Sequence, residues 1–460
     1  MPIVRSISGL RATLDQLTKS LVVDYANAFH KFLGNGGSIV IGRDGRPSGS
    51  WIEGVLVKEL TLLGHDVLLL GVVPTPTVQI NITAHNAVGG IAITASHNPS
   101  NWNGLKFLNG DGLFLNSGDN ERLWSLLNEP ASLVNNIGEV IEVEDPIDMH
   151  IDQVINVPYI ANEIANIRFR LNKMNAVFVI DAVNAGGSVA VPRLLKRLGC
   201  KYEELYCDGT GDFPHIPEPI KENLTALCNY IKKKNIEKSK NEDKNVYMGI
   251  AVDPDADRLV LVDENGELLC EEETVCIAID SYYTLNNDGM KIAVVNQSTT
   301  MLADAVASIY GGRIERSPVG EINVVQKMQQ TGAIIGGEGS GGVILADCHY
   351  GRDSLVGIAL TLAILARLGA TLFTLSDNYP KYAMIKCKKE FDGNREELYS
   401  KIGEIFPQSR ISLIDGIKIT YSNAWVHLRA SNTEPIIRVI AESSTYNRAE
   451  GLANDVLEMI

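Results

Sequence analysis

The chain has few cysteines, and none of them form a pair at the spacing of a metal or redox motif. Seven cysteines stand at scattered positions among 460 residues, and no C-x-x-C pair occurs. Zinc ribbons and thioredoxin-like motifs need such pairs, and small disulfide-stabilised secreted domains need far more cysteine per residue. We therefore expect reduced thiols, a cytoplasmic location and no zinc site.

A positive net charge and a membrane-length apolar run are also missing. The formal charge of −15 at pH 7 argues against nucleic acid or an anionic membrane surface as a partner. Any anionic substrate must then be bound by a local group of Arg and Lys. Residues 1–17 contain no long apolar run and do not resemble a signal peptide. The most apolar window, 355–375, is interrupted by Arg367 and predicts a buried helix rather than a membrane span.

Strand and helix signals alternate along most of the chain. Near the start, short apolar runs at 38–41, 66–70 and 91–93 alternate with segments of helical spacing such as 51–63. The same order, an apolar strand, then a polar or Gly-rich loop and a helix, recurs further along the chain. The chain is too long for one core, and this recurrence predicts an α/β fold with three similar mixed-sheet α/β domains.

The C-terminal residues have a different pattern. Residues 416–421 and 425–428 alternate with a period of two, 436–441 gives a third strand signal, and 448–460 has helical spacing. This pattern predicts a smaller C-terminal α+β domain. The four domains that we expect are 1–150, 151–268, 269–370 and 371–460.

The first loop with chemistry follows the apolar run at 91–93 and reads T-A-S-H-N-P-S-N-W-N-G-L-K. Its proline and its Ser and Asn residues interrupt regular structure, so Ser96 is predicted to lie on a turn just past a strand end. Open α/β sheets bind ligands at that position. His97 and Lys106 add a titratable ring and a cation near one hydroxyl. The alternative is a polar turn in which Ser96 and Asn98 only hydrogen-bond the local backbone.

The second loop, D-P-D-A-D-R at 253–258, comes directly after another apolar strand signal. Asp253, Asp255 and Asp257 form an oxygen-only ligand set, which suits Mg²⁺ better than zinc. An EF-hand loop also begins D-x-D-x-D, but its sixth position is Gly, where this chain has Arg258. A haloacid-dehalogenase-like phosphotransferase reads D-x-D-x-[T/V], and Asp257 stands where Thr or Val belongs. A third alternative is a turn with ordinary surface carboxylates, although three acids this close repel one another unless a cation neutralises them.

The third and fourth loops are rich in groups that bind sugars and phosphates. G-G-E-G-S-G-G at 336–342 contains G-x-G-x-x-G, but no helix starts after it, which argues against a dinucleotide fingerprint. A loop that presents Glu338 and Ser340 to a polyhydroxylated ligand is the better interpretation of this segment. R-A-S-N-T-E-P at 429–435, followed by Arg438, places two arginines and two hydroxyls close together, which suits a phosphate. A turn between strands with surface arginines is the alternative.

In this order the four loops resemble those of the α-D-phosphohexomutase family, which contains phosphoglucomutase, phosphomannomutase and phosphoglucosamine mutase. T-A-S-H-N-P is similar to the family's phosphoserine loop, and D-P-D-A-D-R is similar to its metal loop. G-E-G-S-G is similar to its sugar loop, and R-A-S-N-T-E-P to its phosphate loop. The resemblance covers essentially the whole chain and implies four domains around a central cleft, each of which contributes one loop.

The resemblance also implies a role for each matching residue. Ser96 would carry a phosphoryl group and, with Asp253, Asp255 and Asp257, would bind one Mg²⁺ per active site. The catalytic residues that it implies are Ser96, Arg11, His97 and Lys106. The implied substrate-binding residues are Arg258, Gly320, Glu338, Ser340, Arg429, Ser431, Asn432, Thr433 and Arg438. Which of the three titratable side chains near Ser96 is the general base stays open.

Two positions depart from the family pattern. Relatives commonly read D-G-I-R-G where this chain reads S-G-L-R-A at 8–12, so Arg11 is kept but the acid before it is absent. Many relatives have His where this chain has Gly342. Both positions are expected near the substrate, so they affect sugar specificity rather than the type of reaction.

The implied reaction interconverts hexose 6-phosphate and hexose 1-phosphate through a phosphoserine enzyme and a hexose bisphosphate, which is both activator and intermediate. Because its G-E-G-S-G-G sugar loop is similar to those of archaeal-type phosphoglucosamine mutases, we expect a phosphoglucosamine mutase, with phosphomannomutase/phosphoglucomutase as the alternative. A phosphorylated hexose or hexosamine is the expected partner, with no nucleic acid and no membrane, for a monomer or homodimer. Two other classes stay open: a haloacid-dehalogenase-like phosphatase with Asp253 as nucleophile, and an inactive sugar-phosphate sensor.

Overall fold

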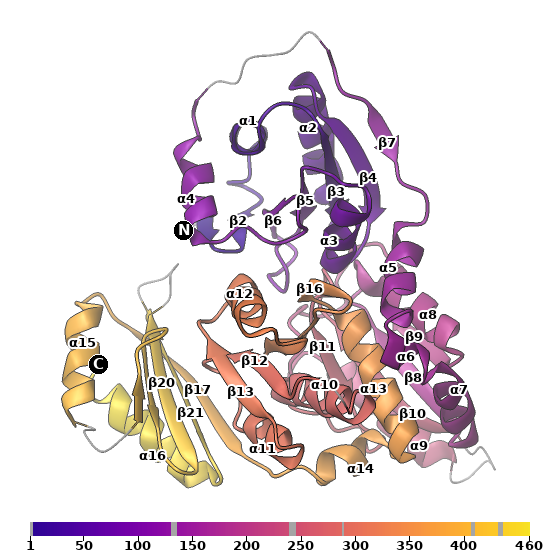
Figure 1. Cartoon of the computed structure of the whole chain (residues 1–460), viewed down its shortest axis with the longest axis vertical. Coiled ribbons are helices and arrows are strands. Elements are labelled where there is room, and N and C mark those ends of the chain that lie inside the picture. The colour runs from indigo at the N-terminus through magenta and orange to yellow at the C-terminus, as the bar shows by residue number, and fades with distance from the viewer. Residues whose placement is uncertain (1–2, 130–135, 239–244, 288, 406–409, 431–435) are drawn as a thin grey trace.

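Four β-sheets follow one another along the chain, each with its own helices (Figure 1). The computed structural model describes residues 3–129, 136–238, 245–287, 289–405, 410–430 and 436–460. In Figure 1 the first sheet lies at the top, the second and third lie together below it, and the fourth lies beside the third. The predicted α/β fold class is therefore confirmed.

The first sheet is mixed and has the strand order β1-β2-β6-β5-β3-β4-β7. The strands from β5 to β7 in this order run parallel, and β6, β2 and β1 are each antiparallel to their neighbours. The elements of this part are β1 (Ile3–Ser6), β2 (Gly9–Thr13), α1 (Lys19–Leu33), β3 (Ser38–Arg43), α2 (Gly49–Leu62), β4 (Asp66–Val72), α3 (Thr75–Ala84), β5 (Gly89–Ile93), β6 (Trp102–Asn109), α4 (Ser117–Ser125), β7 (Val140–Glu142) and α5 (Pro146–Ile155).

The second sheet has the order β11-β10-β8-β9, in which only β11 is antiparallel. The elements of this part are α6 (Pro158–Ala161), α7 (Ile164–Lys173), β8 (Ala176–Asp181), α8 (Gly187–Leu198), β9 (Lys201–Tyr206), α9 (Thr225–Lys238), β10 (Val246–Val252) and β11 (Leu259–Val262).

The third sheet has the order β13-β12-β14-β15-β16, with β15 and β16 antiparallel to their neighbours. The elements of this part are α10 (Glu271–Leu285), β12 (Ile292–Asn296), α11 (Leu302–Ile309), β13 (Arg313–Ser317), α12 (Glu321–Thr331), β14 (Ile335–Glu338), β15 (Gly342–Leu345), β16 (His349–Arg352), α13 (Ser354–Leu368) and α14 (Leu372–Asp377).

These three sheets share a four-strand unit. The rows β4-β3-β5-β6, β9-β8-β10-β11 and β13-β12-β14-β15 each contain three parallel strands and then one antiparallel strand. In each row the antiparallel strand follows the last parallel strand directly in sequence. The predicted recurrence of three similar α/β domains is confirmed, and it places three short connections at equivalent positions.

The fourth sheet is smaller and wholly antiparallel, with the order β17-β21-β20-β19-β18. Its elements are β17 (Ala383–Glu390), α15 (Arg395–Ile405), β18 (Arg410–Ser412), β19 (Ile417–Thr420), β20 (Ala424–Ala430), β21 (Ile436–Ser443) and α16 (Tyr446–Leu457). The sequence pattern predicts the last three strands and the closing helix but not β17. That edge strand is exposed and rich in lysine, which protects sheet edges and hides the strand signal.

One hydrophobic core runs through the first three parts of the chain, and the fourth sheet has its own core. The helix α13 is buried along almost its whole length and packs against α10 and α7. The most apolar window of the sequence therefore forms a buried helix, as predicted. Among the described residues, no helix is both long enough and apolar enough to span a membrane.

Candidate active site

The four loops with predicted chemistry occupy similar positions in the four sheets. Ser96 lies between β5 and β6, the aspartates lie between β10 and β11, and residues 339–341 lie between β14 and β15. Each of these three loops follows the carboxyl end of a parallel strand, which is where α/β sheets bind ligands. The fourth loop joins β20 to β21, and its residues 431–435, including Ser431, Asn432 and Thr433, lie outside the described part of the chain.

Ser96 is buried, and its hydroxyl group points to the aspartate loop. Its Oγ donates to Asp253 Oδ2 at 3.0 Å and lies 3.3 Å from His97 Nδ1. Its backbone has a φ of +50°, which is uncommon for a residue other than glycine and is concentrated at functional sites. The Ser96 hydroxyl thus pairs with a residue from a different sheet, which a merely local turn does not explain.

Arg46 holds the Ser96 loop in this conformation. Its guanidinium is fully buried, and its Nε donates to Asp44 Oδ2 at 2.9 Å. The other two nitrogens donate, at 2.6 to 3.0 Å, to the backbone carbonyls of Ser96, Asn98, Pro99 and Trp102. The sequence analysis did not predict this pair, Asp44 and Arg46, which directly follow β3, the parallel neighbour of β5.

Three buried aspartates converge behind Ser96. One carboxylate oxygen each from Asp253, Asp255 and Asp257 lies within 4.8 Å of the other two. Asp255 Oδ1 and Asp257 Oδ1 are buried and accept no hydrogen bond from any described residue. Buried carboxylate oxygens that lack donors suit a hard cation, so this set of residues fits Mg²⁺.

The three aspartates have different pKa values because all are buried but the charged groups beside them differ. Burial, together with Asp257 and Asp255, raises the pKa of Asp253 well above its usual range. Burial alone would also raise the pKa of Asp255, but Lys106 and the hydroxyl of Thr75 outweigh it and hold that pKa below its usual range. Asp253 is therefore the member of the group that retains a proton most readily.

Two cations of the first sheet face these carboxylates. Lys106, on β6, donates from Nζ to Asp255 Oδ2 at 2.6 Å and to Asp257 Oδ2 at 3.4 Å. Burial alone would lower the pKa of Lys106, but the two carboxylates outweigh it and raise that pKa. Arg11, on β2, donates to Asn98 Oδ1 at 3.0 Å, and its buried Nε has no hydrogen-bond partner among the described residues. Lys106 thus holds its proton, and Arg11 has a donor available.

His97 lies between Ser96 and the arginines. The nearby Arg258 guanidinium, together with burial and Arg11, lowers the pKa of His97 well below its usual range. The backbone N–H of Arg258 donates to Asp253 Oδ1 at 3.2 Å. An uncharged imidazole beside the Ser96 hydroxyl is suited to proton exchange.

The predicted sugar loop is shorter than its sequence suggests. Its first three residues, 336–338, belong to β14, and Gly342 begins β15, because the backbone pairs across this hairpin. The turn itself consists of Gly339, Ser340 and Gly341. Gly341 has a φ of +90°, and a Cβ there would lie 2.5 Å from the carbonyl oxygen of Leu259. Only glycine therefore allows this turn to pack against the start of β11.

Glu338, at the end of β14, collects donors from three segments. Its Oε1 accepts from the backbone N–H of Gly320 at 2.8 Å and from Asn296 Nδ2 at 2.9 Å. Its Oε2 accepts from Arg352 Nη1 at 2.9 Å. The predicted residues Gly320 and Glu338 are thus in direct contact.

Arg352 links the aspartate loop to the sugar turn. Besides Glu338, it donates to Asp257 Oδ2 at 2.5 Å and to Glu321 Oε2 at 3.1 Å. A Cβ at Gly342 would lie 2.2 Å from Arg352 Cδ. Glycine at position 342 therefore leaves the space that Arg352 fills. The sequence analysis did not predict a role for Arg352.

A cleft of about 550 Å³ brings residues of all four parts together. The sequence-predicted residues that line it are Arg11, His97, Lys106, Arg258, Gly320, Glu338, Ser340, Arg429 and Arg438. Ser96 and the three aspartates lie behind this lining. Ser8, which stands at a position expected near the substrate, also lines it. Further lining residues that the sequence analysis missed include Glu271, Glu272, Glu321, Lys386 and His427.

The two predicted arginines of the fourth sheet lie side by side. Arg429 on β20 and Arg438 on β21 are directly opposite in the antiparallel register. Arg429 Nε pairs with Asp415 Oδ2 at 2.9 Å. Like charges directly opposite each other are destabilising unless an anion bridges them, so this position suits a phosphate.

The chain matches models of all four domains of phosphoglucomutase/phosphomannomutase. The α/β/α domains I, II and III match residues 4–133, 157–266 and 271–382, and the C-terminal domain matches residues 386–459. The phosphoglucomutase/phosphomannomutase of Thermococcus kodakarensis is 32% identical over 445 residues, which cover 95% of this chain and 93% of the relative. The phosphoglucosamine mutase of Methanococcus maripaludis is 29% identical over 430 residues, which cover 92% and 91%.

A solved structure has the same fold. The crystal structure of a phosphoglucomutase/phosphomannomutase family protein from Burkholderia thailandensis superimposes with a TM-score of 0.79 at 22% identity, covering 98% of this chain and 95% of that one. The matched domains account for nearly the whole chain, in the order in which the four loops occur. The chain therefore belongs to the phosphoglucomutase/phosphomannomutase family and is a phosphohexomutase.

Proposed function

We propose that this phosphohexomutase carries a phosphoryl group on Ser96 and interconverts hexose 6-phosphate and hexose 1-phosphate through a bisphosphorylated sugar. The observation that carries the proposal is the 3.0 Å hydrogen bond from Ser96 Oγ to Asp253 Oδ2. It places the Ser96 hydroxyl against a buried aspartate cluster whose unpaired oxygens suit a cation. A nucleophile and a charge-neutralising site are thus adjacent, as phosphoryl transfer requires.

In the first transfer, a sugar hydroxyl loses its proton and its oxygen bonds to phosphorus, the bond between phosphorus and Ser96 Oγ breaks, and Ser96 Oγ takes up a proton. A phosphoserine brings a charge of about −1.5 to −2. Mg²⁺ held by the three aspartates and the Ser96 phosphoryl group would neutralise this charge and polarise the phosphorus. Lys106 and Arg11 stabilise the transferring group, and His97, 3.3 Å from Ser96 Oγ, exchanges the serine proton. The reverse transfer, after the bisphosphate turns round, returns phosphate to Ser96.

The opposite side of the cleft would hold the rest of the substrate. Arg429 and Arg438 bind the phosphate that is not reacting, through charge-assisted hydrogen bonds. Glu338 and Ser340 bond to sugar hydroxyls in either orientation of the ring, and Arg258, which also lines the cleft, contacts the substrate beside the aspartates. We assign Ser431, Asn432 and Thr433 to the same phosphate, although they lie outside the described residues.

The preferred substrate that we propose is a hexosamine phosphate, with mannose or glucose phosphate as the alternative. The G-E-G-S-G-G segment at 337–342 and the relatives that are named phosphoglucosamine mutase support this choice. We also propose a monomer or homodimer in the cytoplasm, consistent with the chain's charge of −15.

Replacement of Ser96 tests the covalent mechanism. Ser96→Ala is expected to abolish turnover and to remove the phosphate that mass spectrometry locates on the parent enzyme, while the fold stays intact. Ser100→Ala, at an exposed serine of the same loop, is the matched control. Substantial mutase activity in the Ser96 variant would sink the phosphoserine mechanism. An acid-labile phosphate on Asp253 instead would support the dehalogenase-like alternative.

A second experiment identifies the sugar. One preparation is assayed against glucosamine 6-phosphate, mannose 6-phosphate and glucose 6-phosphate, and kcat/KM is compared. The highest value is expected for glucosamine 6-phosphate. A higher value for either neutral sugar would assign the chain to the phosphomannomutase/phosphoglucomutase activity. Binding of all three without turnover would indicate the inactive sensor.

A further inference from the structure

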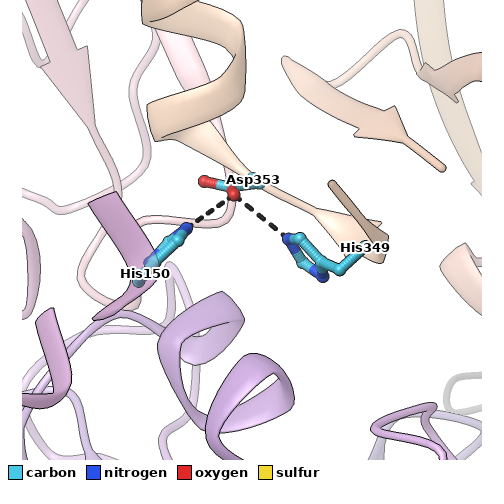
Figure 2. A group of neighbouring side chains, drawn as sticks. All are labelled: His150, His349 and Asp353. Atoms are coloured by element: carbon cyan, nitrogen blue, oxygen red, sulfur yellow. Dashed lines mark hydrogen bonds and ion pairs between the residues drawn. The ribbon is translucent and has the colours of Figure 1, made fainter. Parts of the chain in front are cut away.

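Two histidines and an aspartate converge at a second position, away from the cleft (Figure 2). His150 lies on α5, His349 begins β16, and Asp353 is the N-cap residue of α13. None of the three lines the cleft. Figure 2 shows both imidazole rings pointing to the carboxylate of Asp353. The group therefore links α5, the helix that follows the first sheet, to β16 and α13 in the third part of the chain.

The ligand atoms of this group are close together. His150 Nε2 lies 2.7 Å from Asp353 Oδ2, and His349 Nε2 lies 3.1 Å from the same oxygen. Each residue offers one nitrogen or oxygen within 4.8 Å of the other two. His150 and Asp353 are completely buried. A carboxylate and two imidazoles that meet at one point form a set that binds first-row transition metals, whereas the oxygen-only aspartate cluster suits Mg²⁺.

The surroundings orient these groups as outer partners do at metal sites. His150 Nδ1 lies 2.8 Å from Thr77 Oγ1, so the second nitrogen of this ring has a hydrogen-bond partner. Asp353 Oδ1 accepts from the backbone N–H of Leu355 at 2.8 Å, which leaves Oδ2 turned to the histidines. His150 and Asp353 are thus each fixed by a partner outside the group, with one ligand atom left facing the other members.

We propose that His150, His349 and Asp353 form a binding site for one Zn²⁺ or similar transition-metal ion. The low cysteine content excludes a thiolate site but not this one. Binding uses the lone pair of each Nε2, so each Nε2 gives up the proton that it directs to Asp353. A neutral ring then carries its one proton on Nδ1, and a doubly protonated ring releases one H⁺. At His150 that Nδ1–H then donates to the Thr77 hydroxyl. Zinc bonds of about 2.0–2.1 Å in a tetrahedron separate ligand atoms by about 3.3 Å, so the group opens slightly on binding.

The bound ion would act as a clamp. His150 belongs to α5, while His349 and Asp353 flank Arg352, which holds the aspartate loop and the sugar turn together. A further hydrogen bond between α5 and this region runs from Gln153 Nε2 to the carbonyl oxygen of Cys348. An ion here would therefore stabilise the junction of the first and third sheets without taking part in phosphoryl transfer.

Zinc titration of the full-length chain tests the site. The protein is stripped with a chelator, and excess Mg²⁺ is added to fill the aspartate cluster before calorimetric titration with Zn²⁺. The parent protein is expected to bind one more equivalent of Zn²⁺ than the His349→Gln variant or the Asp353→Asn variant. That additional equivalent should raise the thermal stability of the parent. Asn at 353 is a good N-cap, so this second variant is informative even if His349→Gln does not fold. Mutase activity is not the readout, so the result is independent of the proposed function.

Two controls distinguish the site from adventitious binding. Cys270→Ser removes the exposed thiol and His85→Gln removes an exposed imidazole, and both variants are expected to keep the additional equivalent. Diffraction from zinc-soaked parent crystals at the zinc edge should place the ion between the three side chains. Equal zinc stoichiometry in the parent and Asp353→Asn, or no ion at this position, would overturn the proposal and leave a hydrogen-bonded junction.

Discussion

Arg46 does not line the cleft, yet it binds four carbonyl groups of the Ser96 loop. Ser96 has a left-handed backbone conformation, which costs about 1–3 kcal/mol unless the surroundings stabilise it. A planar guanidinium provides several donors in a fixed arrangement, and a lysine ammonium does not reproduce that geometry. Arg46 is therefore a positioning residue for Ser96.

Arg46→Lys is predicted to lower the rate of Ser96 phosphorylation by added hexose bisphosphate at least about tenfold, because a misplaced nucleophile loses its alignment. KM should change much less, since the cleft lining is intact. Single-turnover phosphorylation followed by mass spectrometry measures the rate. Arg43→Lys, at a half-buried arginine on the same strand end, is the control. An unchanged rate in the Arg46 variant would show that the loop does not need this support.

Among the elements, the hairpin from β10 to β11 carries the three aspartates, and their mutual repulsion makes cation binding depend on pH. Because the pKa of Asp253 is raised in the metal-free hairpin, a proton competes with the cation there. Lowering the pH toward the usual carboxylate range protonates Asp253 and should weaken Mg²⁺ binding. Raising the pH above the pKa of Asp253 removes the competition.

Mg²⁺ binding is therefore predicted to release a proton, and its affinity should fall by up to about tenfold per pH unit below the pKa of Asp253. Calorimetry in buffers with different ionisation enthalpies counts the released protons. The control variant is Asp263→Asn, directly after β11. It should release the same number of protons on Mg²⁺ binding as the parent. Chelation should abolish activity and Mg²⁺ should restore it, with Zn²⁺ supporting poorer turnover. Full activity after exhaustive chelation would contradict the assignment of the aspartates.

The strand pair β20 and β21 presents Arg429 and Arg438 from adjacent positions. Replacing either by Ala is predicted to weaken substrate binding about ten- to a hundredfold, since charge-assisted hydrogen bonds contribute about 1.5–3 kcal/mol each. Remote phosphate binding also positions the reacting end, so kcat can fall as well. Ser96 should still be phosphorylated by added bisphosphate, but only at higher concentrations. Direct binding measurements and product analysis should show more free bisphosphate.

Arg313→Ala is the matched control for this pair, because Arg313 is an exposed arginine on β13 that does not line the cleft. If Arg429→Ala and Arg438→Ala both bind substrate as tightly as the parent and release no additional bisphosphate, the phosphate role is wrong. The loop from Arg429 onward would then be a surface turn.

In the whole molecule, polar contacts hold the fourth sheet against the third. Glu442 on β21 is buried, and it accepts from the backbone N–H of Met301 and from Trp425 Nε1 at 2.7 Å each, as well as from Thr300 Oγ1. Lys418 Nζ donates to the carbonyl oxygen of Gln297 at 2.6 Å. These contacts set the position of Arg429 and Arg438 relative to Ser96.

Glu442→Gln is predicted to lower the thermal stability and to raise KM for the sugar phosphate. The amide keeps one acceptor but turns a donor toward a buried donor, which costs about 1–3 kcal/mol. Differential scanning calorimetry and steady-state kinetics measure the two effects. Glu458→Gln, at an exposed residue after α16, should change neither. An unchanged KM in the Glu442 variant would mean that these contacts do not position the phosphate-binding arginines.

The sequence alone determines the features that depend on neighbouring residues. Apolar runs followed by polar or Gly-rich loops predicted the repeated α/β units, and closely spaced groups predicted Ser96 and the three aspartates, because strand ends and ligand sets are local patterns. The edge strand β17 and the true length of the sugar turn were not predictable in this way. Sheet pairing converts residues 336–338 from loop to strand, and lysines on an edge hide the strand signal.

Only the tertiary structure decides which distant residues support the site. Arg46 meets its carbonyl partners across 50 to 56 positions of sequence, and Arg352 reaches Asp257 across 95. His150 meets Asp353 across 203 positions. No local pattern marks these three residues, because an arginine or histidine in the sequence is equally consistent with an exposed surface. These residues have their roles because they are buried beside groups from distant parts of the sequence, which strand pairing and sheet packing bring within hydrogen-bond distance.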